Sequence, residues 1–212
     1  MVKESGSYRV LIVSAGCSRK MKTFKPLLPL GNHTILENTI HNFQKAGMDD
    51  IVVVVGYKRR ELIPILKRLG VKVAINEDYD QTDMLESVKI GLRVMPADTR
   101  GVLLCPVDIP LILPSTIKEL VETGKKSDAL AVIPAYQGQW GHPLLFGRRI
   151  ASEILRYYGD HGIRGVLSKF SDRIQCIDVP DENMLMNINR PEDYEKLVQI
   201  YNYQKNEILN EL

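Results

Sequence analysis

Apolar runs of strand length alternate with amphipathic stretches along most of this chain. The runs are rich in Val, Ile and Leu and are mostly unbroken, which is typical of strands that are buried on both faces. From this pattern we expect strands over residues 9–15, 50–56, 71–76, 102–107, 129–136, 174–179 and 184–189.

The stretches between these runs predict helices, because apolar side chains recur in them at helical spacing. The first helix is expected to begin near Ile35 and to end at Gly47. The others are expected over residues 59–69, 84–95, 115–122, 149–158 and 191–212. A Ser or Pro opens the helix at 115–122, and Pro191 suits the first turn of the last one.

This alternation of strands and helices implies right-handed βαβ units. The expected fold class is α/β: a single domain with a mostly parallel, Rossmann-like sheet flanked by helices. Ligands of such sheets bind beyond the carboxyl ends of the strands, which draws attention to the loops after Ala15, Val107 and Asn189. Residues 137–146 break the alternation, and we expect them to form a separate lobe.

Composition and charge narrow the class of protein. The 212 residues carry 28 Lys+Arg and 26 Asp+Glu, a net charge of +2, and 44% of them are hydrophobic. This apolar content supports a folded core and excludes a mainly disordered chain. The small net charge argues against a general nucleic-acid or membrane-surface binder. At about 150 residues per domain, one domain is expected, over residues 9–212 after a polar tail over residues 1–8.

Membrane, targeting and cysteine signals point to an ordinary cytoplasmic protein. The longest apolar stretch, residues 51–55, is much shorter than the about 20 residues that a membrane helix needs. Residues 1–8 contain no apolar signal region. The three cysteines Cys17, Cys105 and Cys176 lie far apart without a CxxC motif, so neither a disulfide framework nor a zinc site is expected.

The loop after the first strand concentrates positive charge. Its four cations within seven residues are Arg19, Lys20, Lys22 and Lys25. A loop at the carboxyl end of a buried strand turns its backbone N–H groups towards the ligand crevice, and added cations make it an anion site. Polyphosphate suits this much positive charge, whereas a solvated basic loop is the plainer alternative.

Two well-known phosphate-binding loops do not match this segment. A P-loop has a second Gly directly before its Lys-Ser/Thr pair and leads into a helix. Here Met21 stands at the position of that Gly, and Pro26 and Pro29 prevent a helix. The dinucleotide motif G-x-G-x-x-G is absent as well. The pattern therefore argues against P-loop kinases and nicotinamide dehydrogenases.

Residues 14–30 resemble the signature A-A-G-x-S-x-R-M-G-x-x-K-x-L-L-P-L of the MobA-like nucleotidyltransferases. The matching residues are Ala15, Gly16, Ser18, Met21, Lys25, Leu27 and Leu28. Lys20 stands at the family's Arg and keeps the charge without the bidentate fork. Lys22 stands at the family's Gly, where a side chain restricts the backbone.

Five later segments resemble motifs of the same family in the same order. Residues 87–92 resemble S-[LV]-x-x-G-L, and Asp108 lies in a D-x-P turn that binds metal in the family. Residues 138–143 and 159–167 resemble the G-x-x-G-H-P and G-D-x-G-x-R-x-L-L segments of its molybdenum cofactor cytidylyltransferase branch. Residues 187–194 match [DN]-[IV]-[DN]-T-P-E-D-[YL]. Taken singly, these segments also fit an amphipathic helix, a capping Asp, a tight turn and helix starts.

The resemblance extends from Arg9 to Leu197 and implies a fold of the nucleotide-diphospho-sugar transferase type. The implied reaction is Mg²⁺-dependent: an NTP and a phosphorylated acceptor give a nucleotidyl-acceptor and pyrophosphate. The implied catalytic residues are Lys20, Lys25 and Asp108. The implied nucleotide-binding residues are Ala15, Gly16, Cys17, Ser18, Lys20, Lys22, Lys25, Ser87 and Asp108, and the metal ligands are Asp108 with Asn187, then Asn189. Within an acceptor-side insertion at about 137–172, Trp140, Gly141, His142, Asp160 and Arg164 are expected to bind the acceptor.

The sequence of the first loop favours one nucleobase for the NTP. Three interpretations of the function remain open. Ser14-Ala15-Gly16 is closer to the cytidylyl branch than to the guanylyl branch, which favours CTP. The leading hypothesis is a cytidylyltransferase for a molybdopterin-type cofactor, without nucleic-acid or membrane partners. A cytidylyltransferase for an isoprenoid-precursor or sugar phosphate is the second. The departures at Lys20, Lys22 and the two Asn positions motivate the third, a catalytically weakened nucleotide-binding protein.

Overall fold

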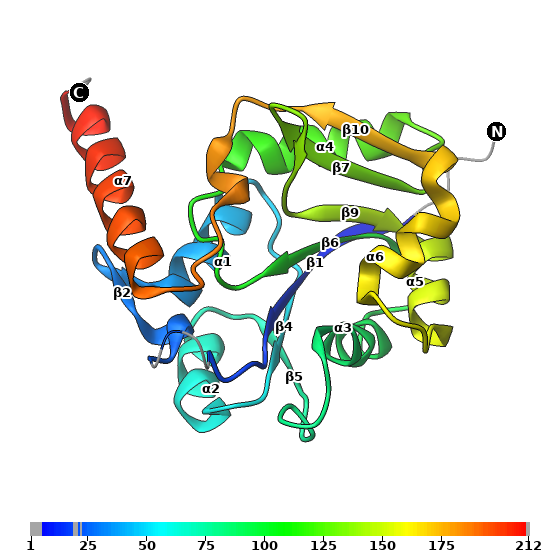
Figure 1. The fold of residues 1–212 in the computed structure, drawn as a ribbon, viewed down its shortest axis with the longest axis horizontal. Helices are drawn as coiled ribbons and strands as arrows, with labels where there is room; N and C mark the ends of the chain where they lie inside the picture. Colours follow the sequence, from blue (N-terminus) through cyan, green and yellow to red (C-terminus); the bar gives the residue numbers. More distant parts are fainter. Residues whose placement is uncertain (1–5, 19–20, 22, 211–212) are drawn as a thin grey trace.

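A central sheet of eight strands forms the middle of the domain (Figure 1). The computed structural model describes residues 6–18, 21 and 23–210, of which residues 207–210 are described by their backbone alone. The strands are β1 (Ser7–Ser14), β4 (Ile51–Val55), β5 (Lys72–Ile75), β6 (Thr99–Pro106), β7 (Ala131–Tyr136), β8 (Gln139–Trp140), β9 (Leu144–Gly147) and β10 (Ile174–Asp178). Their order is β10-β7-β9-β6-β1-β4-β5, with β8 paired to β7. Four pairs are parallel, β1 with β4 and β6, β4 with β5, and β7 with β10. The predicted α/β class with a mostly parallel sheet is confirmed.

Helices cover both faces of this sheet. They are α1 (Ile35–Lys45), α2 (Arg59–Arg68), α3 (Met84–Arg93), α4 (Pro114–Lys126), α5 (Arg148–Arg156), α6 (Gly162–Leu167) and α7 (Pro191–Asn210), with short 3-10 turns η2 (Lys25–Leu27), η3 (Ser168–Arg173) and η4 (Glu182–Leu185). Successive side chains of a strand point to opposite faces. Accordingly, Val10 and Ile12 pack with α1, α2 and α4, while Leu11 and Val13 pack with α3, α5 and α6.

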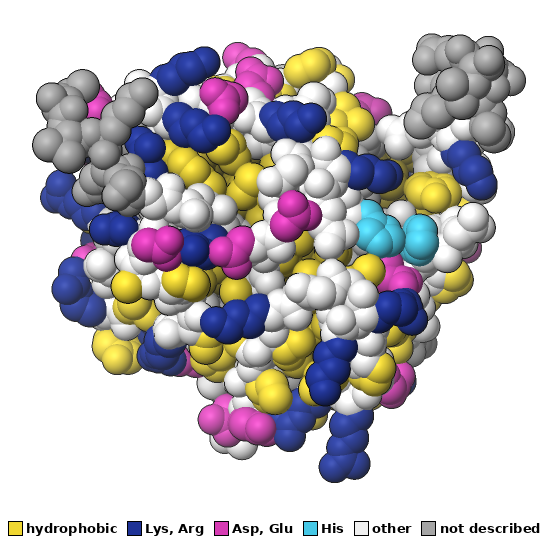
Figure 2. Space-filling model, turned by 180° about the vertical axis from the view of Figure 1, so that it is seen from behind, with side chains coloured by type: hydrophobic (Ala, Val, Ile, Leu, Met, Phe, Trp, Pro, Cys, Tyr) yellow, Lys and Arg dark blue, Asp and Glu magenta, His cyan; other side chains and the backbone are white. Residues whose placement is uncertain are grey.

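A third apolar cluster attaches α7 to the body of the domain. It joins α7 to the hairpin of β2 (Pro29–Leu30) and β3 (His33–Thr34) through Leu30, Ile188 and Leu197. Figure 1 shows α7 at the edge of the molecule, beside this hairpin. None of the described helices combines the length and the apolar character needed to cross a membrane. Figure 2 shows acidic and basic side chains interspersed on one face, in keeping with the small net charge.

Two helices begin with different kinds of cap. Thr34 and Glu37 form a capping box on α1, in which each side chain accepts a hydrogen bond from the other residue's backbone N–H. The start of α4 has Pro114 in its first turn and no side-chain cap from Leu113. Instead, the buried Asp181 accepts hydrogen bonds from the Leu113 backbone N–H (2.9 Å) and the Thr116 hydroxyl (2.8 Å). The cap of α4 therefore comes from a residue distant in the sequence.

Two sequence predictions need correction. Residues 184–189 form no strand, because Met184 and Ile188 pack into different clusters and the Ile188 N–H bonds to the Asp108 carbonyl (3.4 Å). Residues 137–146 are not a separate lobe, because β9 inserts antiparallel between β6 and β7. β1 begins at Ser7, two residues before the predicted start of the first strand, and the polar tail stays a prediction. The domain limits 9–212 and the insertion at 137–172 stay predictions.

Replacing Gly91 with Ala should destabilise the fold by ~1–3 kcal/mol, the usual range for overpacking a core. Gly91 lies where α3 crosses the sheet, and a Cβ there would come within 2.3 Å of Leu11 Cδ1 and 2.9 Å of Val54 Cγ2. Helix propensity alone predicts the opposite sign, since Ala is the better helix former by about 1 kcal/mol. Urea unfolding measures the difference. Ser152→Ala on the exposed side of α5 is the control, and a Gly91→Ala protein as stable as the parent would refute the packing argument.

Candidate nucleotide and acceptor site

The carboxyl ends of three parallel strands meet at one edge of the sheet. The loops after β1, β5 and β6, together with the segment before α7, surround a cavity of about 440 Å³. The predicted residues that line this cavity are Ala15, Gly16, Ser18, Lys25, Ser87, Asp108, His142 and Asn187. Parallel strands bring their carboxyl ends to the same edge, and this brings residues so far apart in the sequence together.

The first loop folds back on itself and returns Lys25 to the cavity. Ser18 has a left-handed backbone (φ 54°), and its hydroxyl accepts a hydrogen bond from the Lys25 backbone N–H (3.3 Å). Lys25 then starts the 3-10 turn η2. Cys17 belongs to the same loop, is half-buried and is not among the residues that line the cavity. Lys20 and Lys22, the other predicted cations, lie outside the described residues.

A glycine in the neighbouring loop permits a close approach of backbones. Gly56 follows β4, and a Cβ there would lie 2.5 Å from Tyr79 Cβ and 2.8 Å from the Ala15 carbonyl oxygen. The next residue, Tyr57, donates its backbone N–H to the same carbonyl (3.0 Å). The absence of a side chain at Gly56 therefore lets Tyr79 reach the wall of the cavity.

Lys25 and Asp108 form the charged centre of the cavity. The Lys25 ammonium donates to Asp108 Oδ2 at 2.8 Å, and their side chains are only 13% and 17% exposed. A carboxylate buried to this extent needs a cation or hydrogen-bond donors, and Lys25 supplies both. An incoming phosphate would compete with Asp108 for this ammonium group.

The donor atoms near Asp108 fit a Mg²⁺ ion that arrives with phosphate. Asn187 lines the same cavity, and the hydrogen bond from the Ile188 N–H to the Asp108 carbonyl holds its loop there. Among the described residues, no group of three or more His, Cys, Asp or Glu could hold a metal. One carboxylate and one amide oxygen suit Mg²⁺, because this ion keeps several waters and takes substrate phosphates as ligands.

Asn189, the alternative metal ligand, has a different role in this structure. It is exposed and is not among the residues lining the cavity. Its backbone N–H and that of Arg190 each donate to the Asp193 carboxylate at 2.8 Å. These hydrogen bonds lower the pKa of Asp193, and the charges of Arg190 and Lys25 lower it further. Asp193 thus fixes the turn that carries Asn187 and the start of α7.

A second, larger cavity adjoins the first. It measures about 980 Å³ and is lined by the predicted acceptor residues Trp140, Gly141, His142 and Arg164. The two cavities share Asp83, Met84 and His142. Asp160, also predicted for the acceptor, is exposed and not among the lining residues, and its carbonyl accepts a hydrogen bond from the Tyr157 hydroxyl (2.7 Å).

His142 forms the wall between the two cavities. Burial lowers its pKa, and Arg164 lowers it further, against the hydrogen bond with the Leu104 backbone and the charge of Asp108, which raise it. Its Nδ1 atom is buried and has no hydrogen-bond partner. His142 therefore lies near enough to both Asp108 and Arg164 for their charges to change its pKa.

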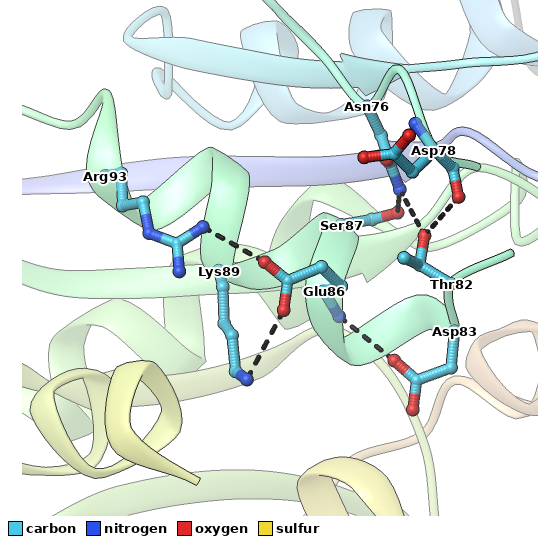
Figure 3. Close-up of polar contacts among 8 residues, drawn as sticks. All are labelled: Asn76, Asp78, Thr82, Asp83, Glu86, Ser87, Lys89 and Arg93. Carbon is cyan, nitrogen blue, oxygen red and sulfur yellow. Dashed lines mark hydrogen bonds and ion pairs between the residues drawn. The ribbon is translucent and has the colours of Figure 1, made fainter. Parts of the chain in front are cut away.

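A polar network that the sequence motifs did not indicate borders the first cavity. Asn76, directly after β5, donates from Nδ2 to the hydroxyls of Thr82 and Ser87, both at 3.0 Å (Figure 3). Asp83 caps α3 by accepting the Glu86 backbone N–H at 3.0 Å. The position of Asn76 at the carboxyl end of a predicted strand is the signal that could have identified it.

Comparison with known proteins agrees with this architecture. The model of the MobA-like NTP transferase domain matches residues 10–174. The bifunctional protein GlmU of Mycolicibacterium gilvum is 31% identical over 123 residues, which make up 54% of this chain and 24% of GlmU. This chain spans about a quarter of the length of the curated relatives that it matches.

Solved structures share the fold over almost the whole chain. A nucleotidyl transferase from Methanothermobacter thermautotroptrophicus has a TM-score of 0.80 at 24% identity, covering 93% of this chain and 98% of that one. Molybdopterin-guanine dinucleotide biosynthesis protein A from Archaeoglobus fulgidus has a TM-score of 0.67 at 16% identity, covering 91% and 97%. Because the family model matches most of the chain and the fold agrees throughout, this protein belongs to the MobA-like NTP transferase family.

Proposed function

We propose that this protein is an Mg²⁺-dependent nucleotidyltransferase that uses CTP and a molybdopterin-type phosphorylated acceptor. The observation that carries the proposal is the pair of adjoining cavities with His142 in their common wall. One cavity contains the Lys25–Asp108 pair, and the other is lined by Arg164. A transferase that joins two phosphorylated substrates needs two such sites side by side.

The reaction requires no nucleophile from the protein. An acceptor phosphate oxygen attacks the α-phosphorus of CTP, a new O–P bond forms, and the bond to the β-phosphate oxygen breaks to release pyrophosphate. Catalysis of such a transfer depends on positioning and on stabilising charge. Lys25 is placed to neutralise the triphosphate and the charge that grows on pyrophosphate. The backbone N–H groups of residues 16–18 add donors at the end of β1.

Asp108 and Asn187 would hold Mg²⁺ together with phosphate oxygens and water. When bound, the ion supplies Lewis-acid stabilisation of charge on the phosphate groups. With the ion held there, Asp108 would contact the metal in place of the Lys25 ammonium, and Lys25 would be available to bind phosphate. The ion pair between Lys25 and Asp108 (2.8 Å) holds both groups in the cavity proposed for the phosphates.

The lining of the larger cavity favours a flat, partly apolar acceptor. Trp140 is 57% exposed and Met84 is 47% exposed, and both line this cavity. An exposed Trp offers a ring face on which a planar group can stack. A phosphate on that group can pair with Arg164, since none of the ion pairs among the described residues uses this guanidinium. These features suit a pterin-type phosphate better than a polyhydroxylated sugar phosphate.

Transfer of label from α-³²P CTP tests the proposal directly. The protein is incubated with Mg²⁺ and, in turn, with a phosphorylated pterin, an isoprenoid-precursor phosphate and a sugar phosphate. With the pterin, we expect a labelled cytidylyl-pterin product and the release of unlabelled pyrophosphate. Transfer only to one of the others would favour the second hypothesis. Transfer seen only after the double change Lys20→Arg and Lys22→Gly would favour a weakened nucleotide-binding protein.

A further inference from the structure

The hydroxyl oxygen of Ser87 already accepts a hydrogen bond from another residue of the protein. The side chain lies on the first turns of α3, is 2% exposed and lines the nucleotide cavity. Its oxygen accepts a hydrogen bond from Asn76 Nδ2 at 3.0 Å. In the described part of the chain, no hydrogen bond has the Ser87 hydroxyl as donor. The O–H hydrogen of Ser87 is therefore available to a ligand in the cavity.

The orientation of the Asn76 amide is fixed by its other contacts. Asn76 is 2% exposed, and its Oδ1 accepts the Asp78 backbone N–H at 3.1 Å, so Nδ2 must face the two hydroxyls. Thr82 donates its own hydrogen to the Asp78 carbonyl at 2.8 Å and can therefore only accept from Asn76. Figure 3 shows the hydrogen bonds that join Asn76 to Thr82 and to Ser87. The donor and acceptor inventory of amides and hydroxyls allows no reversed assignment.

We propose that Asn76 is a positioning residue for the nucleobase, a proposal that rests on the proposed function. By donating to Ser87 Oγ, Asn76 directs the Ser87 hydrogen into the cavity, where it bonds to a ring or carbonyl acceptor of the base. Cytosine offers two adjacent acceptors, its N3 and O2 atoms. A buried donor left without an acceptor destabilises the complex, so a base lacking an acceptor at this point is rejected.

Asn76→Asp tests this role with almost no change of shape. The carboxylate still accepts the Asp78 N–H, but it can no longer donate to Ser87, so the Ser87 hydrogen turns towards it and away from the base. The Kd of Mg·CTP should rise about tenfold or more, whereas the Kd of Mg·tripolyphosphate, which has no base, should change less than twofold. Ser87→Ala should have the same effect, and the double variant should be no worse than either single one.

Further measurements separate the positioning role of Asn76 from two other effects of Asn76→Asp, the added negative charge and a failure of the variant to fold. Gln81→Glu adds the same charge to the exposed part of this loop and should leave both Kd values within twofold. The Asn76→Asp defect, relative to Ser87→Ala, should ease as the pH falls, because a protonated carboxyl again has a hydrogen to donate. Where Asn76→Asp does not fold, Asn76→Ala gives the same comparison: its loss should not add to that of Ser87→Ala.

The outcomes distinguish the inference from the proposed function. Equal CTP affinity in the wild type and the folded Asn76 variant overturns the positioning role and leaves the nucleotide site standing. An equal loss of CTP and tripolyphosphate affinity also overturns it, because that result indicates general damage to the loop. A wild type that binds neither ligand overturns the proposed function and this inference with it.

Discussion

Replacing Lys25 with Met should reduce nucleotidyl transfer by about 10²–10³-fold, the usual cost of removing one electrostatic donor from a transferase or hydrolase site. The Lys25 ammonium contacts Asp108 at 2.8 Å inside the cavity that we propose for the nucleotide. A Met side chain keeps the apolar stem and removes only the charge. Steady-state rates at saturating CTP and acceptor measure the effect.

Controls for Lys25→Met separate catalysis from stability. The substitution leaves Asp108 without its cation partner, so circular dichroism must confirm that the variant is folded at the assay temperature. Lys118→Met on the exposed side of α4 removes a charge far from the cavity and should leave the rate unchanged. A folded Lys25→Met protein with more than a tenth of the wild-type rate would be incompatible with the assigned role.

Replacing Asp108 with Asn should lower the rate by a similar factor and also raise the Mg²⁺ concentration needed for half-maximal activity. Asp108 is the carboxylate that meets Lys25 and lies beside Asn187 in the cavity. An amide oxygen is neutral and binds Mg²⁺ more weakly than a carboxylate oxygen does. Titrating Mg²⁺ at fixed CTP separates this metal effect from the loss of rate.

The matched control for Asp108→Asn is Asp178→Asn. Asp178 lies at the carboxyl end of another parallel strand, β10, but it is exposed and is not among the residues lining the first cavity. Its replacement should change neither the rate nor the Mg²⁺ requirement. An Asp108→Asn protein with a normal Mg²⁺ requirement would remove Asp108 from the metal site.

The sheet could be predicted because its central strands are uninterrupted apolar runs. β1 and β4 lie in the middle of the sheet with helices on both faces, so nearly every side chain is buried and the run itself identifies the strand. β8 and β9 gave no such signal, because they are short and lie on either side of Pro143. Only their antiparallel pairing with β6 and β7 makes them strands.

The candidate site was predictable where a recognisable motif lies just beyond the end of a strand. Gly16 and Asp108 follow β1 and β6, and both reach the predicted cavity. Asn76 was missed because its role depends on the position of α3, which the sequence does not specify. Residues near the start of α7 show the same limit: Asn187 lines the cavity, whereas Asn189 supports the turn through its backbone. Spacing of two residues alone could not separate them.

Thermal unfolding with CTP, GTP, ATP and UTP, each with and without Mg²⁺, tests the central claim most directly. The claim is that the carboxyl edge of the sheet binds a nucleoside triphosphate. A ligand present at 100 times its Kd stabilises a protein by about 2.7 kcal/mol. We predict that CTP with Mg²⁺ gives the largest increase in Tm and that Lys25→Met abolishes it. A folded wild-type protein whose Tm is unchanged by all four nucleotides would contradict the assignment of this edge as a triphosphate site.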